Sequence, residues 1–110
     1  MIIVYVTHEN ENEAQRVIDH LLEKKLIACA NLLPIRSCYF WKGKKENANE
    51  IVTLLKTRKE LWKAVEKEIK KIHPYEVPCI IKIDVEANSE YDSWVKKETG
   101  SSSGNVPRRI

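Results

Sequence analysis

The 110-residue chain has few of the residues that form disulfides or tight turns, with three cysteines, three glycines and four prolines. Cys29, Cys38 and Cys79 are odd in number and widely spaced, and no Cys-x-x-Cys pair occurs. This pattern excludes a disulfide framework, a zinc ribbon and a dithiol redox motif. We therefore expect a cytoplasmic, reducing location and treat the cysteines as small buried hydrophobes.

Other absences exclude whole classes of function. No apolar run approaches the roughly 20 residues of a membrane span, and no basic segment with a cleavage site leads the chain, so we expect neither a membrane partner nor a signal peptide. Without a glycine-rich phosphate loop, a nucleophile elbow or paired carboxylates, we expect no enzyme. The net charge of +3 is spread over mixed Lys and Glu, which argues against a nucleic-acid partner.

The composition that remains is that of a folded protein, because 43% of the residues are hydrophobic and 32% are charged. We expect one domain over residues 1–99, large enough to bury a core without a staple. Residues 100–110, rich in Ser, Gly, Pro and Arg, are expected to form a flexible polar tail.

Hydrophobic periodicity predicts alternating strands and helices. Asn12 is the expected cap of the first helix, Pro34 is expected to kink or bulge a strand, and Pro74 ends the second helix. The order is strand, helix, two strands, helix, strand and a short last helix, which indicates an α+β protein with a ferredoxin-like βαββαβ antiparallel sheet and its two long helices on one face. The predicted strands are 2–7, a strand in two segments (28–33 and 36–41) on either side of Pro34, 50–57 and 79–85, with a glycine-containing turn and a polar loop before residue 50. The predicted helices are 13–25, 59–72 and one from Ser89 to near Gly100.

The face of the sheet without helices is expected to be apolar. A half-exposed antiparallel strand should alternate apolar and polar residues, yet the strand that begins the chain is apolar on both sides. We expect the uncovered face to carry Ile3, Tyr5, Val52, Leu54 and Ile80, a patch larger than monomers usually expose. The short last helix is too small to cover it, so the sequence predicts a homo-oligomer.

The segment His73-Pro74-Tyr75-Glu76-Val77-Pro78 is the densest cluster of chemically capable side chains. Its two prolines hold an imidazole, a phenol and a carboxylate close together. A histidine nitrogen is a common ligand for Cu(II) or Zn(II), and a nearby carboxylate can orient the ring or bind the metal. The alternative is structural, with Tyr75 packing and His73 capping the preceding helix.

The predicted hairpin carries a second group of candidates, Tyr39, Trp41, Glu50, Lys56 and Thr57. They could line a groove with a lysine for anions and a carboxylate for cations. Ordinary packing at an interface is the alternative, since Trp and Tyr are favoured in interface cores.

Several blocks together resemble the CutA divalent-cation tolerance family, over residues 2–96. The blocks are Ala28-Cys29-Ala30-Asn31, Tyr39-Phe40-Trp41-Lys42-Gly43-Lys44, Glu50, Leu55-Lys56-Thr57, His73-Pro74-Tyr75-Glu76-Val77-Pro78, Tyr91 and Trp94. The resemblance implies a cytosolic, non-enzymatic homotrimer linked to copper(II) or other divalent cations, bound weakly or transiently, with no organic cofactor.

The resemblance also concerns individual ligands. Family members that bind copper use a Cys on the first strand and a His-His pair before Pro-Tyr. Here Val6 and Ile72 replace the Cys and the first His, and His73 remains. We therefore expect His73, with Glu76 as a second ligand, to hold a divalent cation.

The nitrogen-regulatory PII proteins look similar in fold and assembly and bind small ligands between subunits. By that analogy the chain could be a signalling module that binds a small anion or metabolite; a third alternative is an interaction scaffold for a partner protein. The expected intersubunit pocket comprises Tyr39, Trp41, Glu50, Lys56, Thr57, Tyr75, Glu76 and Trp94.

Overall fold

The computed structural model describes residues 1–100, so the predicted tail from residue 101 onward lies outside the described residues. Four antiparallel strands form one sheet in the order β2-β3-β1-β4, and the predicted α+β, ferredoxin-like fold is confirmed. A single 3₁₀ turn, Lys59–Leu61, precedes the second helix. The elements are β1 Ile2–His8, α1 Glu11–Glu23, β2 Cys29–Trp41, β3 Lys44–Thr57, α2 Trp62–Ile72, β4 Ile80–Asp84 and α3 Ser89–Glu98.

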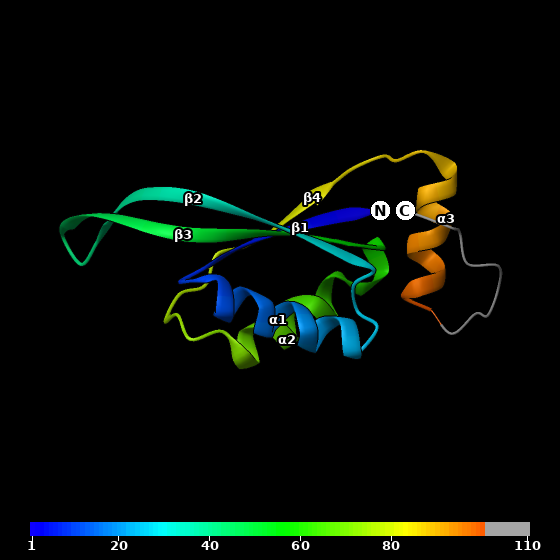
Figure 1. Cartoon of the computed structure of the whole chain (residues 1–110), viewed down its shortest axis with the longest axis horizontal. Coiled ribbons are helices and arrows are strands. Elements are labelled where there is room, and N and C mark those ends of the chain that lie inside the picture. Colours follow the sequence, from blue (N-terminus) through cyan, green and yellow to red (C-terminus); the bar gives the residue numbers. More distant parts are fainter. Residues whose placement is uncertain (101–110) are drawn as a thin grey trace.

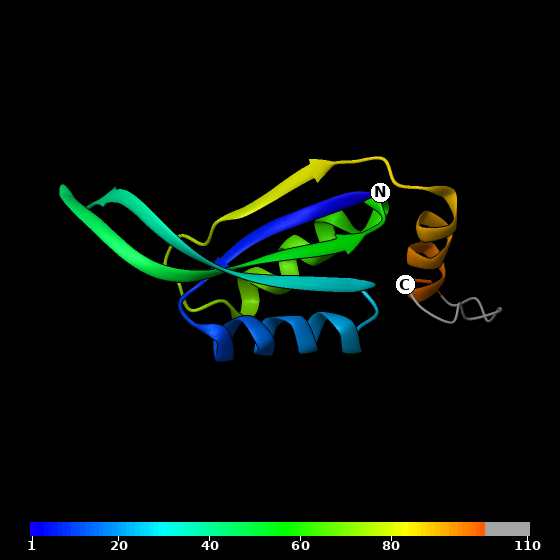
Figure 2. The ribbon, with the colours of Figure 1, turned by 45° about the horizontal axis from the view of Figure 1, so that its top comes forward.

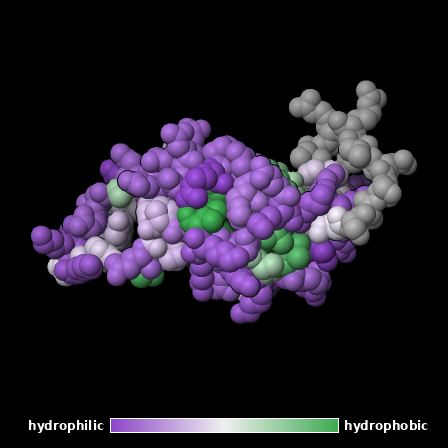
Figure 3. Space-filling view, turned by 90° about the horizontal axis from the view of Figure 1, so that it is seen from below, coloured by the Kyte–Doolittle hydropathy of each residue, from purple (hydrophilic) through white to green (hydrophobic). Residues whose placement is uncertain are grey.

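Helices α1 and α2 lie side by side on one face of the sheet, while α3 lies beyond one end of it (Figure 1). The core fills the space between these two helices and the sheet, and its residues include Val4, Val17, Leu55, Val65 and Ile69, all fully buried. Seen from the helix side, the surface is mostly hydrophilic (Figure 3). Helices α1 and α2 therefore cover this face of the sheet and present a hydrophilic surface to solvent.

Helix α1 begins two residues earlier than the sequence predicted. The prediction of Asn12 as its cap was wrong, because the side-chain oxygen of Asn10 accepts the backbone N–H of Glu13 at 2.9 Å. The cap satisfies one of the free amides of the first turn, and the acidic Glu11 and Glu13 suit the positive end of the helix dipole.

Strand β2 runs straight through Pro34, so the predicted kink or bulge there was wrong. Its pairing with β3 is continuous from Cys29 to Trp41, with Pro34 opposite Ile51. A proline is tolerated because β2 lies at the edge of the sheet. Residues 45–49, which the sequence predicted as a loop, belong to β3, since Lys42 and Gly43 both have positive φ and form a two-residue turn.

The β2–β3 hairpin is much longer than the sheet that supports it. Strand β1 pairs with β3 only along Ile51–Thr57, and the remainder of β3 has β2 as its one neighbour among the described residues. The hairpin therefore projects as a two-stranded ribbon (Figure 2). Such a ribbon is marginally stable by itself in water, so its length favours packing against another chain.

The face of the sheet opposite α1 and α2 has no helix over it in either view (Figures 1 and 2). The prediction of Ile80 on this face was wrong: Ile80 pairs with Val6, on the helix side, and packs against the core. Ile81 and Ile83 lie on the uncovered face instead, opposite Tyr5 and Ile3, and are 49% and 42% exposed. Leu33, also on this face, is 49% exposed. Val52 lies on this face as predicted but is only 2% exposed. The apolar patch is therefore present, with Ile81, Ile83 and Leu33 exposed on it in place of Ile80 and Val52.

Helix α3 is fixed to the body of the protein at its C-terminal end. The guanidinium of Arg58 donates to the hydroxyl and carbonyl oxygens of Thr99 at 3.1 and 3.0 Å. None of the helices within residues 1–100 combines the length and apolarity needed to cross a membrane.

Candidate functional site

His73 is the C-cap residue of α2, and the hydrogen bonds of its ring determine how it can act. Nε2 lies 2.8 Å from the carbonyl oxygen of Thr7, which can only accept, so Nε2 carries the proton. Nδ1 then holds a lone pair, and it accepts the backbone N–H of Tyr75 at 3.2 Å. The residue as a whole is 8% exposed. The backbone N–H of His73 also donates to Ile69, so the structural role predicted for it is present as well.

His8, at the end of β1, stacks on His73 with ring centroids 5.3 Å apart and an interplanar angle of 27°. It is 1% exposed, and its Nε2 lies 2.9 Å from the hydroxyl oxygen of Thr53. Its Nδ1 has no hydrogen-bond partner within the described residues. Burial, and then the neighbouring His73, lower the pKa of His8 to about 4, so the ring is neutral at pH 7.

Tyr75 and Glu50 meet on the other side of this cluster. The Tyr75 hydroxyl donates to Glu50 at 2.6 Å, and the Tyr75 ring contacts His73 edge-on at 4.7 Å. Burial, followed by the Glu50 carboxylate, raises the pKa of Tyr75. The same two causes raise the pKa of Cys79, while a hydrogen bond with Thr7 opposes them. The loop after α2 thus closes over the end of β1 and contacts β3.

Glu76 has no hydrogen bond or ion pair with His8, His73, Tyr75 or Glu50 among the described residues. Its side chain is 70% exposed, and its carboxylate lies 3.9 Å from the Lys42 ammonium. Within residues 1–100, no three His, Cys, Asp or Glu side chains are grouped as a metal site would require. The two stacked imidazoles nevertheless suit a divalent metal, because imidazole nitrogens are common metal ligands and His8 has a buried, unpartnered ring nitrogen.

A second group of predicted residues lies at the opposite end of β3. The Lys56 ammonium lies 5.6 Å from the centre of the Tyr91 ring, and Tyr91 packs against Trp94 at 5.7 Å. Cys29 is the pairing partner of Lys56. The prediction of three buried cysteines was wrong, because Cys29 and Cys79 are half-buried and Cys38, on an edge strand, is exposed. Burial, followed by Cys29, raises the pKa of Tyr91 to about 12, so its hydroxyl stays protonated near neutral pH.

One protomer does not bring all the predicted pocket residues together. Tyr39 and Trp41 lie near the hairpin turn, and twelve residues of strand, about 40 Å, separate Lys56 from the end where Trp41 pairs with Lys44. Thr57 lies on the helix side, fully buried, and donates to Leu26 at 2.7 Å. Only a second chain could place the hairpin turn beside the Lys56 group.

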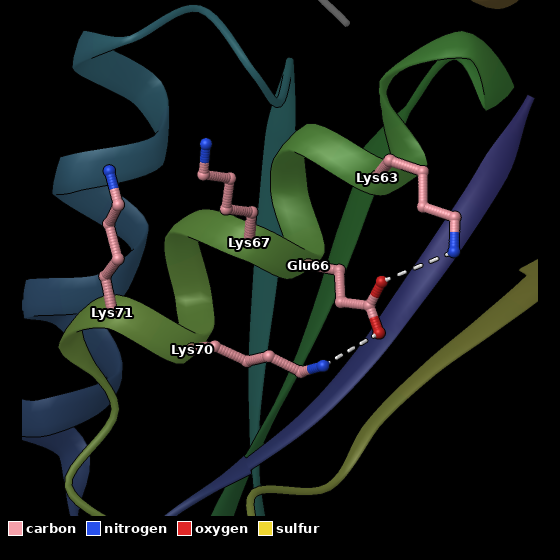
Figure 4. Close-up of a pocket in the computed structure, with 5 residues that line it drawn as sticks. All are labelled: Lys63, Glu66, Lys67, Lys70 and Lys71. Atoms are coloured by element: carbon pink, nitrogen blue, oxygen red, sulfur yellow. Dashed lines mark ion pairs between the residues drawn. The ribbon is translucent and has the colours of Figure 1, made fainter.

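The surface of residues 1–100 includes the following two depressions. One, of about 520 Å³, lies where the ribbon leaves the sheet and is lined in part by Glu9, Arg36 and Glu50. The other, of about 480 Å³, lies along α2 and is lined by four lysines and Glu66, which forms ion pairs with Lys63 and Lys70 (Figure 4). Its charges are largely paired and face solvent, which is typical of a solvated helix surface.

His8 is the member of the site that sequence reasoning missed. It stands in the same alternation as Ile2, Val4 and Val6, which fill the core. A histidine in a row of buried strand residues was the available signal. Its closeness to His73, 65 residues further along the chain, could not be read from spacing.

A family model and individual relatives both match this chain, and they name the same family. A family model described as "CutA1 divalent ion tolerance protein" matches residues 2–98. A divalent-cation tolerance protein CutA from Pyrococcus horikoshii is 47% identical over 100 residues, which are 90% of this chain and 98% of that protein.

Solved structures agree with this comparison. The crystal structure of CutA1 from Pyrococcus horikoshii has a TM-score of 0.88 at 45% identity, covering 92% of this chain and all of that one. A structure described as the PII-like protein CutA from Nostoc sp. PCC 7120, in apo form, has a TM-score of 0.85 at 30% identity over 91% of this chain and 98% of its own.

Proposed function

Since the chain belongs to the CutA1 divalent ion tolerance family, we propose that it is a non-enzymatic cytoplasmic homotrimer that binds Cu(II) weakly, with His73 as a ligand. The family name links it to divalent cations. Copper(II) is the specific choice because it has the strongest affinity of the divalent first-row metals for nitrogen ligands.

The observation that carries this proposal is the fixed orientation of the His73 ring. Metal-binding histidines usually donate their other ring N–H to a carbonyl or carboxylate, which fixes the tautomer and turns the free nitrogen toward the metal. His73 donates from Nε2 to Thr7 in this way, and Nδ1 is held only by a 3.2 Å contact with the Tyr75 amide. A metal that replaced this amide would leave the orienting bond in place.

Trimer formation is supported by the uncovered apolar face and by the projecting ribbon. Ile81, Ile83 and Leu33 expose between 42% and 49% of their surface on that face. Monomeric proteins rarely expose a patch of this kind. Neighbouring copies would bury it and would support the hairpin beyond the end of β1.

Titration of Cu(II) into the wild type and His73→Gln tests the metal proposal. We expect the substitution to weaken binding by about tenfold or more, in line with the loss of one ligand. His20→Gln is the matched control, because His20 is a partly exposed histidine whose ring pairs with Glu68 on the helix side. Equal affinity for the wild type and His73→Gln would contradict the proposal, and Glu76→Gln tests the carboxylate in the same assay.

A second candidate function is the binding of a small anion near Lys56. Its supporting observation is that Lys56, half-buried over the Tyr91 ring, has no ion pair among the described residues. A thermal-shift screen against phosphate, nucleotides and carboxylic acids would detect such a ligand, because a ligand of the native state raises its stability. The candidate fails if no anion stabilises the wild type more than Lys56→Met.

A further inference from the structure

We propose that His8 supplies a second imidazole ligand, through Nδ1, to the divalent-cation site at His73. The inference rests on the proposed function of His73 and extends it to a side chain on a different element. It starts from the buried and unpartnered Nδ1 of His8. A buried polar atom without a partner is uncommon in folded proteins and calls for an explanation.

The hydrogen bonds around Thr53 decide what this nitrogen offers. The Thr53 hydroxyl is directed at the carbonyl oxygen of Val6, 3.5 Å away, and can donate to it. His8 Nε2 then donates to Thr53 Oγ1 at 2.9 Å, which leaves Nδ1 as a bare lone pair. A metal ion binds a neutral imidazole through such a lone pair, which accepts no hydrogen bond from the protein.

The two histidines therefore share one arrangement. Each donates a hydrogen bond from Nε2–H to a fixed oxygen, Thr53 Oγ1 for His8 and the Thr7 carbonyl for His73. Each has Nδ1 as its remaining nitrogen, and the rings are stacked with centroids 5.3 Å apart. Thr7 and His8 are consecutive residues of β1, so one strand end orients one imidazole and carries the other.

The electrostatic surroundings also favour a cation here. The carboxylates of Glu13 and Glu50 are close enough to act on His8, and Arg16 opposes them. Two imidazoles make a weaker site than three or four protein ligands, as expected for a transient Cu(II) site.

The first experiment counts imidazoles at the bound metal. Electron spin-echo envelope modulation of substoichiometric Cu(II), in a Cys38→Ser background that removes the exposed thiol, distinguishes one coordinated imidazole from two. We expect two in the otherwise wild-type protein and one in His8→Gln. A single imidazole before the substitution would overturn the role of His8.

A positioning variant keeps the test valid if His8→Gln does not fold. Thr53→Val removes the oxygen that accepts the hydrogen bond from His8 Nε2, and we expect it to weaken Cu(II) binding by about tenfold. Thr57→Val is the matched control, because Thr57 is a fully buried threonine on the same face of β3 that donates to Leu26 instead. Equal affinity in Thr53→Val and Thr57→Val would also overturn the inference.

The outcomes separate this inference from the proposal on which it rests. If His73→Gln loses binding while His8→Gln and Thr53→Val retain it, His73 is a ligand and the His8 inference fails. If His73→Gln binds Cu(II) as tightly as the wild type, the proposed function fails first. Loss of binding in both histidine variants, with two imidazoles before substitution, supports the paired site.

Discussion

The hydrogen bond between Tyr75 and Glu50 is expected to stabilise the folded protein by a measurable amount. The hydroxyl donates at 2.6 Å to a carboxylate that is 8% exposed. Tyr75→Phe removes the hydroxyl but keeps the ring that packs against His73. Since a hydrogen bond to a charged group contributes about 1.5–3 kcal/mol, we expect the free energy of unfolding to fall by about 2 kcal/mol.

A double-mutant cycle isolates this bond from other effects of the substitution. In a Glu50→Gln background the acceptor is neutral, so Tyr75→Phe should cost about 1 kcal/mol, as a neutral hydrogen bond does. The assay is guanidinium unfolding at pH 7 and a fixed protein concentration, since an oligomer's stability depends on concentration. Tyr39→Phe is the control, because Tyr39 is 44% exposed on the hairpin and should change stability by less than about 0.5 kcal/mol. Equal losses in the two Glu50 backgrounds would refute the reasoning.

Three further predictions concern single elements. Hydrogen bonds from His20 and Lys71 lower the pKa of Glu68 to about 2, so its contribution to stability should be complete above pH about 4.5 and lost as the pH falls toward 2; Glu68→Gln should flatten the pH dependence of unfolding over this range. Gly43→Ala should lower the free energy of unfolding by about 1 kcal/mol, because φ is +81° there, and an unchanged denaturation midpoint would contradict this. Asn10→Ala removes the α1 cap and should also cost about 1 kcal/mol by the same assay; a loss confined to Asn12→Ala would contradict the cap assignment.

The sequence predicted the elements well wherever hydrophobic periodicity was unbroken. Residues 2–7 and 79–85 became β1 and β4 within two residues, and residues 59–72 became the 3₁₀ turn and α2. The errors arose where the local sequence indicated one structure and the tertiary structure imposed another. Pro34 looked like a break, but an edge strand tolerates it, a property that only the sheet order reveals.

The uncovered face is apolar as predicted, but two predicted members were wrong: Ile80 lies on the other face and Val52 is buried. Ile81 and Ile83 lie on one face of their strand and Ile80 lies on the other, so both faces carry apolar side chains. Only the register with β1, which pairs Ile80 with Val6 and Ile81 with Tyr5, assigns them to faces. A shift by one residue exchanges the two faces, and sequence periodicity does not fix the register.

The sequence predicted the His73 loop of the candidate site but not its contacts with other segments. The His73 loop stood out because its prolines concentrate chemically capable residues, but the Tyr75 contact with Glu50 and the stacking of His73 on His8 join segments 25 and 65 residues apart. Such contacts follow from the pairing of β1 with β3 and from the path of the chain after α2. The predicted placement of Tyr39 and Trp41 beside Lys56 stays a prediction, since it needs a second chain.

Sedimentation equilibrium at micromolar concentration tests most directly whether other copies of the chain cover the bare face of the sheet. We predict a mass of about 38 kDa, three times the 12.8 kDa of one chain, and a shift toward the single-chain mass for Ile81→Asp, which places a charge on that face. A homogeneous wild-type species of about 13 kDa would show Ile81, Ile83 and Leu33 facing water and would contradict this assembly.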